Sequence, residues 1–169
     1  MGNKFEEEFG VTPYDVTICA SMAHQSDWLD IADNLRSRGL SVAIPEISEP
    51  VAWADLSDDD VAARKGRFVR QHLALISASR SILVCNYAKN EIDNYVGANT
   101  LMEMTAAYIW NIPIFLLNGT PMTSNRDEVL AMRPVFLHGN IDTLSLSLQD
   151  DASIKTLAPE LQQTAQGGL

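Results

Sequence analysis

The feature that most constrains the fold is a regular alternation of short apolar runs with stretches whose apolar residues recur about every 3.6 positions. The apolar runs predict strands at Asp15–Ala20, Leu40–Pro45, Arg80–Asn86, Ile112–Leu117 and Val135–His138. The periodic stretches predict helices at Ser26–Arg38, Arg64–Ser79 and Asn99–Asn111. Strands that alternate with helices form βαβ units, in which helices cover both faces of a parallel sheet. We therefore predict an α/β fold: a doubly wound, flavodoxin-like sandwich with a mainly parallel five-stranded sheet.

The length of 169 residues and a hydrophobic content of 46% suit one domain with a sizeable core. We expect that domain to span 1–149 and to be followed by a polar C-terminal tail, 150–169, that is a frayed helix or disordered. The segment Glu46–Asp60, which contains Trp53, has no clean period and predicts a long surface loop. Such a loop is either a functional lid or a mobile, solvated insertion.

The net charge of −10 argues against a nucleic-acid or anionic-membrane partner, because both need a basic surface. A small phosphorylated ligand is still possible, since it needs only a local binding site. The acidic start MGNKFEEEFG is unlike a signal peptide, and no apolar run reaches membrane-spanning length. Cys19 and Cys85 are too few for a disulfide framework. These features favour a reduced, cytoplasmic protein.

The segment Gly97–Trp110 carries one carboxyl group, Glu103, within an otherwise apolar helix. Apolar residues surround nearly the whole circumference, which predicts a helix that is buried on most sides. A carboxylate is rarely buried unless it is paired or has a function. Glu103 is therefore either a catalytic nucleophile or base, or a residue on a narrow solvent-facing stripe, or the partner of an arginine or lysine.

Further candidates follow from the rule that ligands bind at the carboxyl ends of parallel strands. Ser21 and Met22 follow the first strand and begin a helix, which suits a phosphate. Asn86 ends the third strand and Asn118 follows the fourth, where amides suit a base or a sugar, although Asn118 before glycine is also a turn signal. No glycine-rich fingerprint is present, which argues against a dinucleotide or a triphosphate.

The three histidines lie in different predicted elements and lack the spacing of a zinc site: His24, His72 and His138. His72 shares a helix face with Phe68 and Ile76, so we expect a core or interface histidine whose hydrogen bonds are satisfied. The basic cluster within Arg64–Arg67 predicts a solvated helix start, with a phosphate contact as the alternative.

Two segments carry a resemblance to a known superfamily: NYVGANTLMEMTAAYIWNIPIFLLN and DEVLAMRPVFLHGNI. With the order of strand ends, they resemble the nucleoside 2-deoxyribosyltransferase-like superfamily over roughly Val16–Leu144. In that superfamily a helix that follows a glycine-containing loop bears a glutamate that attacks the anomeric carbon of a nucleoside, and Glu103 stands at that place. The resemblance implies cleavage of the N-glycosidic bond of a (deoxy)nucleoside or nucleoside monophosphate, by transfer to another base or to water. This chemistry requires neither a metal nor an organic cofactor.

The resemblance and the strand ends together assign roles to nine residues. The catalytic candidates are Glu103, Asp93 and Tyr95, and the substrate-binding candidates are Ser21, Met22, Asn86, Gly97, Asn99 and Asn118. Tyr95, Asn99 and Asn86 are candidate donors to the Glu103 carboxylate, and Asp93 is a candidate to bind a sugar hydroxyl or to protonate the base. The chain differs from the transferases at two positions, with Asn86 in place of an aspartate and Gly97 in place of a carboxylate.

Two further functions stay open at this stage. On the same fold, a non-catalytic nucleotide-binding or sensing module would use Glu103 only to hold a ribose hydroxyl. Hydrolysis of NAD by a related carboxylate mechanism is the third possibility. Because members of the superfamily often complete their sites across a dimer, we also expect a homodimer or a higher homo-oligomer.

Overall fold

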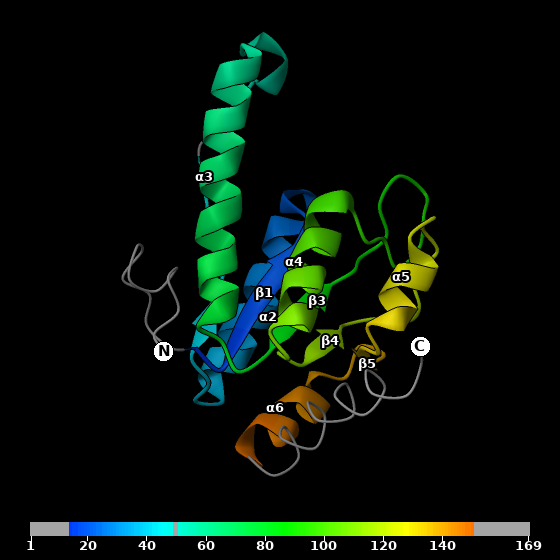
Figure 1. Cartoon of the computed structure of the whole chain (residues 1–169). Coiled ribbons are helices and arrows are strands. Elements are labelled where there is room, and N and C mark those ends of the chain that lie inside the picture. Colours follow the sequence, from blue (N-terminus) through cyan, green and yellow to red (C-terminus); the bar gives the residue numbers. More distant parts are fainter. Residues whose placement is uncertain (1–13, 49–50, 151–169) are drawn as a thin grey trace, which may run out of the picture.

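The computed structural model describes residues 14–48 and 51–150, and its centre is a five-stranded sheet (Figure 1). The strands are β1 (Val16–Ala20), β2 (Val42–Ala43), β3 (Ile82–Cys85), β4 (Ile114–Leu116) and β5 (Val135–Phe136). Every neighbouring pair is parallel, and the order is β2-β1-β3-β4-β5. This order is that of flavodoxin-like folds, so the predicted fold class is confirmed.

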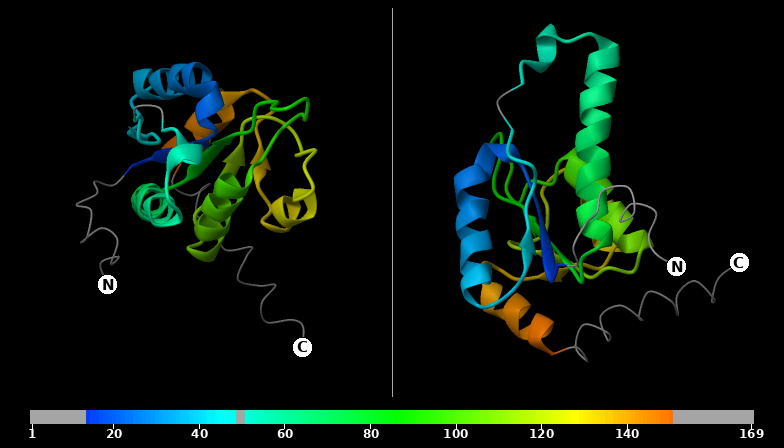
Figure 2. Two further views of the ribbon diagram at one scale, coloured as in Figure 1. Left: turned by 90° about the horizontal axis from the view of Figure 1, so that it is seen from above. Right: turned by 90° about the vertical axis from the view of Figure 1, so that its left-hand side faces the viewer.

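Helices cover both faces of the sheet (Figure 2). They are α2 (Gln25–Ser37), α3 (Asp58–Ser77), α4 (Ala98–Ile109), α5 (Arg126–Ala131) and α6 (Ile141–Gln149), with short 3-10 turns η1 (Met22–His24) and η2 (Trp53–Asp55). One core cluster joins α2 and α6 to one face of the sheet, and a second joins α3, α4 and α5 to the other. Along β1, Ile18 belongs to the first cluster and Cys19 to the second, because successive side chains of a strand point to opposite faces. Within the described residues, no helix has both the length and the apolar character that crossing a membrane requires.

Helix α3 begins earlier than the sequence predicted, at Asp58 instead of Arg64. The Ser57 hydroxyl accepts a hydrogen bond from the Asp60 backbone N–H. Three aspartates in the first turn also stabilise the helix, because their negative charge lies at the positive end of the helix dipole. The basic cluster at Arg64–Arg67 therefore lies inside the helix and does not start it. The segment that we expected to be a loop contains η2 and the first turn of α3.

Two helices were not predicted, α5 and α6. Helix α5 has only six residues, and the leucines of α6 alternate with serines, which is the pattern of a strand in sequence. The predicted tail lies outside the described residues except for Asp150.

Helix α4 is less buried than its apolar sequence predicted. Met104 and Ala107 are fully buried, but Met102 is 48% exposed and Ile109 is 67% exposed. Only one side of α4 packs on the sheet and against α3, which leaves an apolar stripe facing outward. The expectation that this helix is buried on most sides was therefore wrong for the single chain.

Candidate functional site

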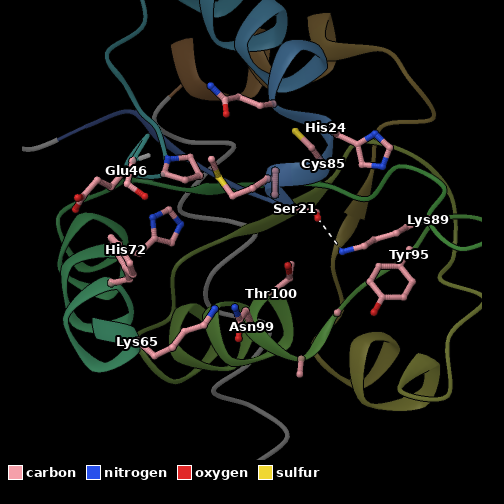
Figure 3. Close-up of a pocket in the computed structure, with 18 of the residues that line it drawn as sticks. Ser21, His24, Glu46, Lys65, His72, Cys85, Lys89, Tyr95, Asn99 and Thr100 are labelled. Carbon is pink, nitrogen blue, oxygen red and sulfur yellow. Dashed lines mark hydrogen bonds between the residues drawn. The ribbon is translucent and has the colours of Figure 1, made fainter. Parts of the chain in front are cut away.

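A pocket of about 740 Å³ opens at the carboxyl ends of β1 and β3 (Figure 3). These neighbouring strands lead to helices on opposite faces of the sheet, and ligands of open α/β folds bind at this reversal. The walls come from the residues after β1, the segment after β2, helix α3, the residues after β3 and the start of α4. The volume lies within the range of small-molecule sites, about 300–1,000 Å³.

Helix α3 forms one wall because it rises above the carboxyl edge of the sheet (Figure 1). Its wall residues include Lys65 and Phe68. Trp53 packs edge-on against Phe68 with ring centroids 6.4 Å apart, and the Lys65 ammonium lies 4.4 Å from the centre of the Trp53 ring. Trp53, in the segment after β2, thus packs against α3 and borders the pocket.

The opposite side of the pocket has a cationic corner at the start of α4. Lys89 donates a hydrogen bond from Nζ to the Ser21 hydroxyl at 3.1 Å, and its Nζ lies 5.5 Å from the centre of the Tyr95 ring. Tyr95 packs against Gly97, where a Cβ atom would lie 3.0 Å from the ring. The first turn of α4 contains no acidic residue, so its backbone N–H groups add to the positive potential. This corner suits an anionic group such as a phosphate.

Glu103 projects from α4 toward β1 and α3, and its side chain is 19% exposed. Its Oε1 atom lies 3.7 Å from Nε2 of His72, and its Oε2 atom is buried without a hydrogen-bond partner. Burial raises the pKa of Glu103 to about 8, although a hydrogen bond with the Cys19 thiol lowers it. Among the described residues, Glu103 therefore lies neither on a solvent-facing stripe nor beside an arginine or lysine.

His72 connects Glu103 to the pocket, because it lines the pocket and Glu103 does not. The residue is 9% exposed, and burial lowers its pKa to about 4, against a hydrogen bond with the Ile18 backbone that raises it. Its Nε2 atom is buried without a hydrogen-bond partner. The expectation of a core histidine was correct, but the expectation that its hydrogen bonds are satisfied was wrong.

The structure brings most of the predicted site residues to this pocket. Those that line it are Ser21, Met22, Tyr95, Gly97 and Asn99. Asn86 does not line it, because it is buried and tied to the neighbouring loop: its Oδ1 accepts from the Asn118 backbone at 2.9 Å and its Nδ2 donates to the Gly119 carbonyl at 3.0 Å. Asn118, which is hydrogen-bonded to Asn86, does not line the pocket either. Asp93 is exposed and also lies outside the pocket lining.

Sequence reasoning missed several residues of the site. Lys89 lies in the loop shortly after β3, so a set of strand-end candidates that extended further into this loop would have included it. Cys19 and His72 had no such signal, because only the folded sheet brings β1 and α3 together beside α4.

No protein-family model matches the chain, and no curated protein matches it either. Among solved structures, the crystal structure of a conserved protein from Enterococcus faecalis V583 is similar, with 15% sequence identity and a TM-score of 0.43. The matched region covers 90% of this chain and 99% of that protein. The fold assignment rests on the strand order of the chain itself.

Proposed function

We propose that the protein cleaves the N-glycosidic bond of a nucleoside monophosphate or a (deoxy)nucleoside, with Glu103 as the reacting carboxylate. The observation that carries the proposal is a buried carboxyl group beside a small-molecule pocket, with one oxygen that has no hydrogen-bond partner. Strongly perturbed carboxyl groups at a cleft are typical of catalytic sites.

The two ends of the pocket suit the two ends of a nucleotide. Lys89 and Ser21, with the start of α4, offer donors to a phosphate. On the α3 side, Trp53 and Phe68 offer aromatic surface to a base. A sugar between these ends would lie near His72, and so near Glu103.

The reaction passes through an oxocarbenium-like state, which a carboxylate stabilises and can trap covalently. The bond from C1′ to the base nitrogen breaks as a bond from C1′ to a Glu103 oxygen forms. Water or a second base then displaces Glu103 from C1′.

With a pKa of about 8, Glu103 holds a proton near neutral pH in the empty pocket and must release it before the attack. His72 Nε2 is an acceptor 3.7 Å away that also lines the pocket. The pKa of His72, about 4, lies below that of Glu103, so the imidazole would not keep this proton but would pass it on to the departing base, which needs one to leave as a neutral molecule. Asp93 lies outside the pocket lining, so this route replaces the one that the sequence suggested for it.

The alternative is a nucleotide-binding or sensing module without turnover. The position of Glu103 behind the pocket lining favours it, because the carboxyl reaches the sugar only if His72 or the substrate moves. Both functions use the same pocket and differ in whether a base is released.

We also propose that the protein is a homodimer. The outward stripe of α4, with Met102 and Ile109, is an apolar surface that a second copy would cover. Helix α4 also begins at the pocket, so a partner on this stripe would lie close to the site.

The test is chromatographic detection of free base from a panel of nucleosides and nucleoside monophosphates, with and without a second base. We expect release or exchange from the wild type and a loss of at least about a thousandfold in Glu103→Gln, which keeps the shape but cannot attack. Glu128→Gln is the matched control, because Glu128 is an exposed carboxyl on α5 and should leave the rate unchanged.

Release that persists in Glu103→Gln would refute the role of Glu103. If folded wild-type protein releases no base from any compound, yet a nucleotide raises its melting temperature, the binding module is the correct function.

A further inference from the structure

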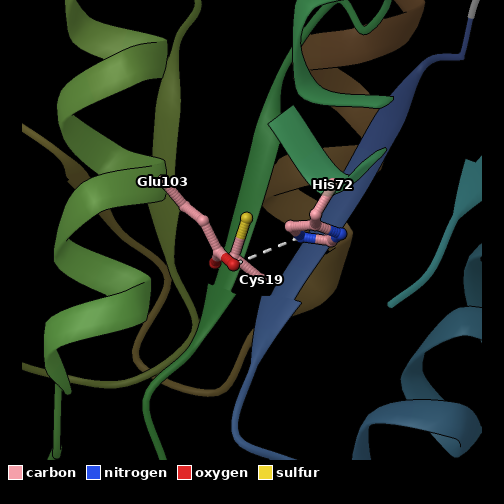
Figure 4. A group of neighbouring side chains, drawn as sticks. All are labelled: Cys19, His72 and Glu103. Carbon is pink, nitrogen blue, oxygen red and sulfur yellow. Dashed lines mark ion pairs between the residues drawn. The ribbon is translucent and has the colours of Figure 1, made fainter. Parts of the chain in front are cut away.

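Three side chains from three separate elements meet beside the pocket: Cys19 of β1, His72 of α3 and Glu103 of α4 (Figure 4). One thiol, imidazole or carboxylate atom of each lies within 4.8 Å of the others. Nε2 of His72 and Oε1 of Glu103 lie 3.7 Å apart. We call these residues the Cys19–His72–Glu103 cluster.

Hydrogen bonding leaves this cluster incomplete. Nε2 of His72 and Oε2 of Glu103 are both buried without a partner, and they account for two of the three such side-chain atoms in the described part of the chain. A buried polar atom without a partner costs about 1–3 kcal/mol, so two neighbouring ones require an explanation. The third, on Trp28, lies in the core of the other face of the sheet.

We propose that the Cys19–His72–Glu103 cluster binds a zinc ion. Thiolate, imidazole and carboxylate are the three ligand types that zinc takes from proteins, with bonds of about 2.0–2.3 Å that place tetrahedral ligand atoms roughly 3.3–3.8 Å apart. The His72–Glu103 separation of 3.7 Å is slightly longer than the roughly 3.3–3.5 Å that zinc sets between a nitrogen and an oxygen ligand. With Cys19 inside the 4.8 Å limit of the cluster, small movements of the three side chains would complete the site. A thiolate and a carboxylate together neutralise the two charges of the ion.

The surroundings of the cluster suit zinc in two further ways. The His72 ring makes a hydrogen bond to the Ile18 backbone while Nε2 stays without a partner, and zinc-bound histidines are usually oriented by such a second bond. His72 also lines the pocket, which gives the ion a path of entry. The thiolate disfavours magnesium and calcium, which prefer oxygen ligands.

Zinc at this site would hold the carboxylate that the proposed reaction needs. We therefore expect the zinc-loaded protein to release no base, and this one consequence rests on the proposed function. The binding of zinc itself does not.

The test is calorimetric titration of Zn²⁺ into the full chain after treatment with a chelator, repeated for Cys19→Ala and His72→Ala. We expect one ion per chain in the wild type and at least tenfold weaker binding in both variants. Cys85→Ala is the matched control, because Cys85 is the other buried cysteine, on the neighbouring strand, and lies outside the cluster. Circular dichroism of each variant establishes that it is folded.

A titration with Co²⁺ supplies a second readout, because a cobalt–thiolate bond produces an intense near-ultraviolet charge-transfer absorption. This band should appear in the wild type and in Cys85→Ala but not in Cys19→Ala. The proposal is overturned if the wild type binds no Zn²⁺, or if Cys19→Ala binds it as tightly as the wild type.

These outcomes are independent of those for the proposed function. Zinc binding, together with no base release from any compound by the chelator-treated, zinc-free protein, would leave the metal site standing and remove the glycosidic reaction. Base release that requires Glu103, in a protein that binds no zinc, would do the reverse.

Discussion

The surroundings of two carboxyl groups, Glu103 and Asp15, shift their pKa values in opposite directions. Glu103 has a pKa raised to about 8, because it is buried and few donors reach it. For Asp15, burial also acts to raise the pKa, but hydrogen bonds from Ser41 and Arg80 outweigh it and lower the pKa below the ordinary value. The Asp15 oxygens accept from the Ser41 backbone and hydroxyl at 2.8 Å each, and from Arg80 at 2.9 Å. At the residue scale, the number of hydrogen-bond donors separates the lowered pKa of the Asp15 carboxyl from the raised pKa of the Glu103 carboxyl.

Asp15→Asn should lower the free energy of unfolding by about 1 kcal/mol at neutral pH, because an amide accepts these hydrogen bonds less strongly than a carboxylate. The folded-state pKa of Asp15 is depressed, so its stabilisation is present above the unfolded-state pKa of 3.8 and is lost as the pH falls through the lower folded-state value. Urea denaturation at neutral pH and in strong acid measures both, and the difference between variant and wild type should disappear in acid.

The control for this prediction is Asp127→Asn, whose carboxyl group is 88% exposed beside Arg126. An exposed ion pair contributes little, so this variant should match the wild type at both pH values. An Asp15→Asn deficit of the same size in acid would contradict the assignment to the charged form.

At the scale of elements, α3 decides the shape of the site. Its twenty residues span about 30 Å at 1.5 Å per residue, far more than the strands beside it. One end of α3 extends beyond the sheet (Figure 1), and Lys65 and Phe68 of this helix line the pocket. Gly66 lies between these two residues, and glycine is a poor helix former because it loses the most backbone freedom on folding.

Gly66→Ala should therefore raise the free energy of unfolding by about 0.5–1 kcal/mol. The added methyl group would meet only the end of the Arg70 side chain, at 3.5 Å, which is an ordinary contact. Thermal and urea denaturation of the variant and the wild type measure the change.

Gly39→Ala provides the contrast, since Gly39 follows α2 with a φ of +85°. A side chain would meet no atom within 4 Å there, yet the left-handed backbone disfavours alanine. This variant should be less stable than the wild type, and a gain in stability would show that the backbone argument is wrong.

At the scale of the whole molecule, the outward stripe of α4 is the feature that a single chain leaves unexplained. Met102 and Ile109 lie two turns apart on one side of the helix, and both are largely exposed. Apolar side chains grouped in this way are typical of surfaces that a partner covers.

Sedimentation at micromolar concentration should therefore find a dimer, and Met102→Glu should convert it to a monomer by placing a charge in the contact. Met122→Glu is the matched control, because Met122 is 66% exposed but lies outside α4, and it should stay dimeric. A monomeric wild type would sink the proposal.

The sequence alone determined the class of the fold. The five predicted strands all exist within a few residues of their predicted bounds, because alternation between β-branched runs and helical periods is a local property of the chain. The end of the first predicted strand led to Ser21 and Met22, and both line the pocket. The early start of α3 was missed although Ser57 and the aspartates after it mark it locally, whereas the short helix α5 has too few residues to show a period.

Only the tertiary structure decided which side chains meet. Asn86 appeared suited to a substrate, but the folded chain pairs it with Asn118, since β3 and β4 are neighbours. Cys19 and His72 showed no functional pattern, yet both lie beside Glu103 because α3 and α4 pack on the same face of β1. A sequence records the order of its elements along the chain, whereas contacts between elements depend on the order of strands in the sheet and on the face that each helix covers.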